Sequence, residues 1–63
     1  MTRLQYTGNN YDEIRTLLGG KVLAPYFCMG FTMLSVLTDD GYESVYEGDT
    51  IEVDDAGKVT VCR

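Results

Sequence analysis

Histidine and tryptophan are absent from this 63-residue chain, and proline occurs only once. Without histidine the chain lacks the side chain that most often performs acid–base chemistry near neutral pH and that commonly binds zinc. The sequence contains no spacing typical of an activated nucleophile, and so short a chain leaves little room for a water-excluding pocket. We therefore expect no enzyme, no catalytic residue, no metal site and no cofactor.

Positive charge is scarce. Five Lys and Arg face ten Asp and Glu, which gives a net charge of −5 and argues against duplex nucleic acid as a partner. Eight of the acids fall in residues 39–63, mostly in expected turns or at outward strand positions. Such positions are typical of a solvated surface that discourages edge pairing. The order of these acids does not match a calcium-binding loop.

Long hydrophobic runs are also missing, and cysteine is rare. The most apolar stretch, residues 22–37, is interrupted by Pro25 and Gly30, whereas a membrane-spanning helix needs about 20 apolar residues. The two cysteines, Cys28 and Cys62, show no C-x-x-C spacing, and no secretory hydrophobic segment begins the chain. We expect no membrane partner, a cytoplasmic location, and two buried, reduced thiols, with a disulfide between Cys28 and Cys62 as the alternative.

One short helix is expected near the start of the chain. Asn10 can cap it, Glu13 can reach back in a capping-box arrangement, and Gly19-Gly20 can end it in a left-handed conformation. The apolar residues between these signals fall on one face, so the helix must pack on another element.

The remaining elements are expected to be strands joined by short turns. Alternating or β-favouring residues predict strands at 4–6, 34–37, 42–46, 50–54 and 58–62. Turn residues at 38–41, 47–49 and 54–57 separate the last four, with Ile51, Val53, Val59 and Val61 pointing inward. The sequence therefore predicts a single α+β domain spanning residues 1–63, with the helix laid across a small antiparallel meander.

Residues 22–34 are too apolar for a solvent-exposed loop. Their aromatic and methionine side chains exceed what so small a core can absorb, and surplus apolar surface usually marks an interface or a ligand groove. We expect a homo-oligomer interface formed by Tyr26, Phe27, Met29, Phe31 and Met33. A ligand wall and an ordinary core segment are the alternatives.

The segment before the helix is a second candidate site. Gly8, Asn9 and Asn10 could present backbone N–H groups and amides to an anion, with Arg15 one turn further along. Tyr6 and Tyr11 could stack on a base. A plain capped helix start is the alternative interpretation.

The order Tyr6-Thr7-Gly8-Asn9-Asn10, Glu13-Ile14, Gly48-Asp49 and Ile51 resembles small tailed-phage proteins that pair a TGNN…EI start with a late GD-x-I segment. The chain departs from them at Thr50, where they tend to carry an aromatic residue. The chain is also similar in its small size and general character to phage proteins that block bacterial immunity by trapping nucleotide signals, as anti-Thoeris and anti-CBASS sponges do. It shares no sequence motif with them. Those sponges are non-catalytic oligomers with pockets at or near subunit interfaces.

The resemblance implies a phage-encoded anti-defence protein that sequesters an ADP-ribose-like nucleotide signal in the host cytoplasm. The residues then expected at the ligand are Tyr6, Gly8, Asn9, Asn10, Tyr11, Arg15, Tyr26 and Phe27. The alternative is an acidic inhibitor or accessory protein that occupies a basic host partner through residues 39–55.

Overall fold

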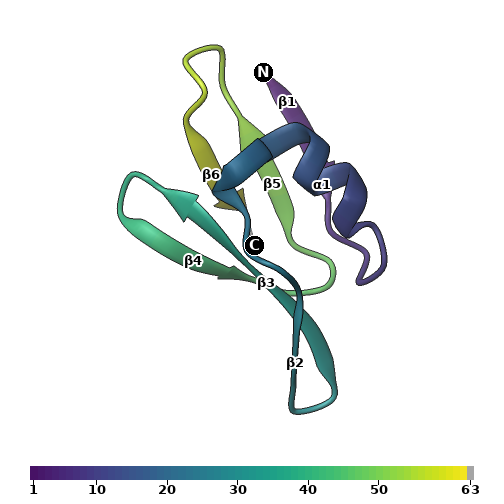
Figure 1. Cartoon of the computed structure of the whole chain (residues 1–63). Coiled ribbons are helices and arrows are strands. Elements are labelled where there is room, and N and C mark those ends of the chain that lie inside the picture. The colour runs from purple at the N-terminus through teal and green to yellow at the C-terminus, as the bar shows by residue number, and fades with distance from the viewer. Residues whose placement is uncertain (63) are drawn as a thin grey trace.

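The computed structural model describes residues 1–62 and contains one α-helix and six strands (Figure 1). In chain order the elements are β1 (Thr2–Gln5), α1 (Tyr11–Leu18), the 3-10 helix η1 (Gly19–Lys21), β2 (Tyr26–Cys28), β3 (Phe31–Thr38), β4 (Gly41–Val45), β5 (Thr50–Val53) and β6 (Val59–Cys62). The expected α+β class with one short helix near the start is confirmed.

The strands form two antiparallel three-stranded sheets, in the orders β1-β5-β6 and β2-β3-β4. The expected single meander is therefore wrong, because β4 and β5 follow each other in the chain but lie in different sheets. Hydrogen bonds at the intervening turn explain the separation. The Gly48 amide donates to the Tyr6 carbonyl at 2.8 Å, and the Tyr6 amide donates to the Asp49 carbonyl at 2.9 Å. These bonds direct the chain onto β1, with Leu4 opposite Ile51.

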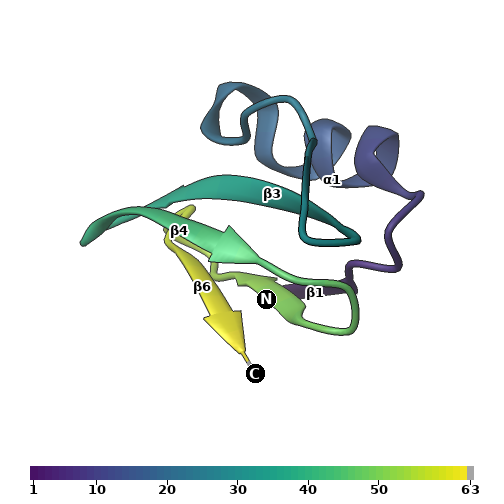
Figure 2. The same ribbon diagram turned by 90° about the horizontal axis from the view of Figure 1, so that it is seen from below.

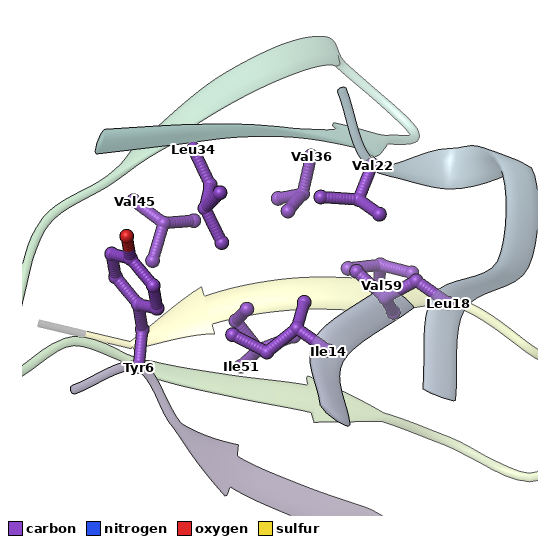
Figure 3. Packing of buried hydrophobic residues seen from close by; sticks show 9 residues of the cluster. All are labelled: Tyr6, Ile14, Leu18, Val22, Leu34, Val36, Val45, Ile51 and Val59. Carbon is purple, nitrogen blue, oxygen red and sulfur yellow. The ribbon is translucent and has the colours of Figure 1, made fainter. Parts of the chain in front are cut away.

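The core lies between the two sheets and α1. Figure 3 shows Leu34, Val36 and Val45 from one sheet directed toward Ile51 and Val59 from the other, with α1 contributing beside them. The complete cluster is Tyr6, Ile14, Leu18, Val22, Leu34, Val36, Val45, Ile51 and Val59. The inward direction expected of Ile51 and Val59 is confirmed, and Val53 and Val61 pack against this cluster while remaining partly exposed.

The end of α1 follows its sequence signals, whereas its start does not. Gly19 has a φ of 63°, and its amide donates to the Arg15 carbonyl, so a residue without a Cβ ends the helix as expected. The capping prediction for Asn10 is wrong, since its side chain makes no capping hydrogen bond. The amide group of Asn10 is instead bound within the preceding loop.

Residues 26–38 form a hairpin in which Pro25 precedes the first strand and Gly30 lies in the turn, so both residues fall at breaks between regular elements. Cys28 pairs with Phe31, leaving a two-residue turn in which Met29 (φ 52°) and Gly30 (φ 87°) are both left-handed. Two positive φ values are typical of the type I′ turn, whose twist matches that of the strands it joins. The β3–β4 part of the sheet is strongly twisted (Figure 2), and the β2–β3 tip projects from the rest of the molecule (Figure 1).

Both cysteines are free thiols, but the prediction that both are buried is wrong: Cys28 is exposed and Cys62 is partly exposed. Within residues 1–62, no helix has the length and apolar character required to cross a membrane.

Candidate binding surface

The β2-β3-β4 sheet presents apolar side chains on both faces. Leu34 and Val36 of β3 point into the core, so their neighbours Met33 and Leu37 point away from it, because successive side chains of a strand alternate between faces. The register places further residues on that second side. We call it the outer face, and its members are Tyr26, Cys28, Phe31, Met33, Ser35, Leu37, Tyr42 and Ser44.

One polar contact links the strands across this face. The Tyr26 hydroxyl lies 3.4 Å from the Ser44 Oγ, although the two residues are on the outer strands of the sheet. This contact confirms the side to which Tyr26 points. Its ring therefore lies over the middle strand, where it pairs with Met33.

The outer face carries no ionisable acid or base apart from the cysteine thiol and tyrosine hydroxyls, in a chain whose net charge is −5. Its aromatic members remain substantially exposed, with Phe31 at 53% and Tyr42 at 55%. β3 thus carries apolar side chains on both faces, with Leu34 and Val36 on one and Phe31, Met33 and Leu37 on the other, while only the first face contributes to the core cluster of this chain. An uncovered patch of this kind usually marks a binding surface.

An apolar hollow of about 280 Å³ lies at the hairpin end of the outer face, lined by Cys28, Met29, Phe31, Met33 and Tyr46. Met33 forms its floor and is 6% exposed, although it lies outside the core cluster. Tyr46, directly after β4, brings a second aromatic ring to the hollow. The predicted interface residues Met29, Phe31 and Met33 therefore do lie together.

Met29 at the hairpin tip combines two unfavourable features. Its side chain is 91% exposed, and its backbone is the single left-handed non-glycine position among residues 1–62. Side chains with a Cβ strain such a conformation by about 1–3 kcal/mol. Asparagine or glycine would fit this turn better, so an exposed methionine here indicates a role outside the folding of this chain.

The predicted loop site before α1 is largely occupied by its own hydrogen bonds. The Asn10 Oδ1 accepts from the Thr7 amide at 2.8 Å, and its Nδ2 donates to the Gln5 carbonyl at 2.8 Å. The Asn9 Oδ1 accepts from the Thr7 hydroxyl at 2.8 Å. These amides stabilise the loop.

Gly8 lies against a carboxylate. A Cβ built on this residue, whose φ is +94°, would be 2.7 Å from the Glu47 Cδ. The Glu47 Oε2 in turn accepts from the Thr32 amide of β3 at 3.3 Å. A negative charge at this distance opposes the phosphate that Gly8 was expected to hold.

The structure does not gather the other predicted ligand residues into one site. The prediction that Tyr6 stacks on a ligand is wrong. Tyr6 is 0% exposed and forms part of the core, so neither face of its ring is available for stacking. Tyr11 packs partly against the same core, and Arg15 lies on the exposed side of α1. Tyr26 and Phe27 are neighbours in β2 and point to opposite faces of the sheet.

Three acidic residues lie in a separate polar groove of about 340 Å³, which is lined by Thr38, Asp39, Asp40, Glu43, Lys58, Val59 and Thr60. Lys58 partly neutralises it, with its Nζ 3.7 Å from an Asp39 carboxylate oxygen. Throughout residues 1–62, no three acidic or cysteine side chains are grouped so that they could hold a metal ion. Asp54 has a structural role at its turn, where Oδ1 accepts from the Ala56 and Lys58 amides.

Cys62 lies beside an ion pair on the second sheet, in which the Arg3 Nε is 2.6 Å from the Glu52 carboxylate. A hydrogen bond to Glu52, partial desolvation and the negative charge of that carboxylate raise the pKa of the Cys62 thiol, while Arg3 opposes the shift. A raised pKa lowers the thiolate fraction at neutral pH. Cys62 is therefore a poor nucleophile.

No family model, curated protein or solved structure matches this chain. The role of the candidate surface is therefore inferred from its geometry and composition alone. Leu37, Tyr42 and Tyr46 also belong to this surface and are not among the residues predicted from the sequence. The signal was present in β3, where Phe31, Met33 and Leu37 share one side of the strand, and in the turn register that places Tyr42 opposite Leu37.

Proposed function

We propose that this protein is a non-catalytic protein-binding module whose working surface is the outer face of the β2-β3-β4 sheet. The observation that carries the proposal is the two-sided apolar character of β3, which has a core on one side and exposed Phe31 and Leu37 on the other. Aromatic residues and methionine are enriched at protein interfaces, and tyrosine is among the residues that most often carry the binding energy.

The strained Met29 supports the same proposal. A residue that opposes its own turn geometry and remains exposed gives no benefit to the isolated chain. Methionine adapts its shape to a partner because it is unbranched and polarizable. The tip of the hairpin that presents it projects away from the rest of the chain (Figure 1).

Site-specific photo-crosslinking in producing cells tests this proposal. A benzophenone amino acid replaces Tyr42 on the outer face, and in a matched control it replaces Thr60, which is exposed on β6. We expect irradiation to give a discrete crosslinked product from position 42 and none from position 60. Equal products from both positions, or none from position 42, would reject the outer face as the working surface.

Sequestration of a nucleotide is a second candidate function, favoured by the hollow beside Phe31 and Tyr46. Its volume of about 280 Å³ and its aromatic lining are compatible with a nucleobase held by stacking. In this candidate function the nucleobase would bind at the hairpin and not at the loop before α1. The expected ligand is still the ADP-ribose-like nucleotide that the phage resemblance predicts.

Calorimetry with cyclic and linear ADP-ribose-type compounds tests the second candidate. If it is correct, Phe31→Ala should weaken binding by about 10- to 100-fold, the usual effect of removing one stacking ring. Phe27→Ala, on the opposite face, should leave the affinity unchanged. Absence of binding heat with every compound would reject this candidate and leave the protein-binding proposal unaffected.

A further inference from the structure

We propose that the occupant of the outer face is a second copy of this chain, so that two β2-β3-β4 sheets pack face to face about a two-fold axis. This inference rests on the proposed function and names the partner of the same surface. In such a dimer each β3 strand is covered on both sides, as its sequence predicts.

The available area fits a dimer of this kind. A large aromatic side chain contributes about 150–250 Å² when fully buried. With the observed exposures of Tyr26, Phe31, Tyr42, Tyr46 and Met29, the patch offers roughly 600 Å² per copy. Two copies would bury about 1,200 Å², the lower end of the range for stable specific interfaces.

Charge distribution favours a second copy on this face. Two molecules that each carry a net charge of −5 repel one another over most of their surfaces. The outer face lacks carboxylates and lysine or arginine side chains, so packing two such faces desolvates no fixed charge. The tyrosine hydroxyls of residues 42 and 46 can remain hydrated at the rim.

Chain size points the same way. A domain of about 60 residues buries only about 60% of the surface of its unfolded chain and is only marginally stable alone. This chain has no disulfide among residues 1–62 and no metal cluster there. Association through a second apolar layer is the remaining common means of stabilising so small a fold.

Two phenylalanines of the same hairpin allow a matched test. Phe31 lies on the outer face and is 53% exposed, whereas Phe27 is 75% exposed and points to the opposite face. Both are solvent-accessible, so neither Phe31→Ser nor Phe27→Ser empties the core. Sedimentation equilibrium from about 1 to 200 µM would measure the association of wild type and both variants, with circular dichroism confirming that each is folded.

We expect wild type to reach twice the 7.0 kDa mass of one chain. Phe31→Ser should raise the dissociation constant at least about tenfold, the usual threshold for an interface hot spot, and Phe27→Ser should change it less than about threefold. If Phe31→Ser fails to fold, Tyr42→Ser, at 55% exposure on β4, is interpreted in the same way.

A folded wild-type monomer at 200 µM would overturn the dimer. An assembly that depends on Phe27 and not on Phe31 or Tyr42 would also overturn it, since the contact would then involve the other face or the edge of β2. The crosslinking experiment separates this failure from that of the proposed function. If wild type is monomeric but still crosslinks a different protein through position 42, the dimer is rejected and the proposed function is retained. If wild type is monomeric and gives no crosslink, the dimer and the proposed function are both rejected.

Discussion

Tyr6 is completely buried, although its side chain ends in a polar hydroxyl group. Its ring fills the core beside Val45 and Leu34 (Figure 3), and its hydroxyl is the single buried side-chain oxygen or nitrogen in residues 1–62 without a hydrogen-bond partner. An unsatisfied buried polar group costs about 1–3 kcal/mol. The hydroxyl therefore opposes the stability that the ring provides.

Tyr6→Phe should accordingly increase the free energy of unfolding by up to about 1–2 kcal/mol, because it retains the ring and removes the unpaired hydroxyl. Tyr6→Ala should lower it by about 3–5 kcal/mol, as expected for loss of a buried aromatic side chain. Urea denaturation at a fixed protein concentration measures both. A loss exceeding about 1 kcal/mol in Tyr6→Phe would indicate that the hydroxyl makes a stabilising contact.

Alkaline pH provides an independent test of this residue. Desolvation by burial, followed by the negative charge of Glu47, raises the pKa of Tyr6 above its usual value of 10.0. The unfolded chain then loses this proton at a lower pH than the folded chain, so stability should fall as pH rises above about 10. The unfolding free energy of Tyr6→Phe, measured by urea titration, should fall less steeply with pH above about 10 than that of wild type. Identical pH profiles would contradict the shift.

At the scale of elements, the β2–β3 hairpin combines local strain with exposed apolar surface. Met29→Asn should stabilise the dilute protein by about 0.5–1 kcal/mol, because asparagine adopts the left-handed conformation more readily. The same substitution should weaken association through the outer face, since it removes a 91% exposed methionine from the rim of the hollow. A gain in unfolding free energy together with weaker association in sedimentation would support a binding role for Met29. A change of both quantities in the same direction would oppose it.

Glu47 connects three elements that are distant in sequence. It contacts Gly8 before α1 and accepts the Thr32 amide of β3 while lying in the turn that precedes β5. Gly8→Ala should cost about 1–3 kcal/mol from backbone strain, with a further loss because the new Cβ displaces the Glu47 carboxylate. In a Glu47→Ala background the loss should shrink to the backbone contribution. An unchanged loss in that background would show that the two residues are not coupled.

Local sequence patterns predicted most of the helices, strands and turns, but few of the contacts between residues that are distant in the sequence. The left-handed Gly19 and the turn at Asp54 follow from residue chemistry over a few positions, and both occur as expected. The division into two sheets depends on hydrogen bonds between Tyr6 and residues 48–49, which no local pattern encodes. The apolar segment was recognised as surplus, but its division between core and outer face required the β3–β4 register.

At the scale of the whole molecule, the fold places charge and apolar surface on different parts. The acidic turns at Asp39–Asp40 and Asp54–Asp55 lie at the ends of hairpins, whereas the outer face has no carboxylate. The described chain is elongated, with extents of 34 × 21 × 20 Å. A partner on the outer face therefore meets apolar side chains along β3 and β4 and reaches the carboxylates of Asp39 and Asp40 at the turn that joins these strands.

We expect the outer face to be covered in the assembled protein, and the methionine methyl groups report on this coverage. Met29 at the hairpin tip and Met1 at the N-terminus are both largely exposed in the single chain, so Met1 is an internal control. Methyl NMR with a soluble paramagnetic agent would compare their broadening at about 10 µM and 1 mM protein. We predict that the Met29 methyl becomes protected at the higher concentration while Met1 remains broadened. Equal broadening of both methyls at both concentrations would contradict a covered outer face.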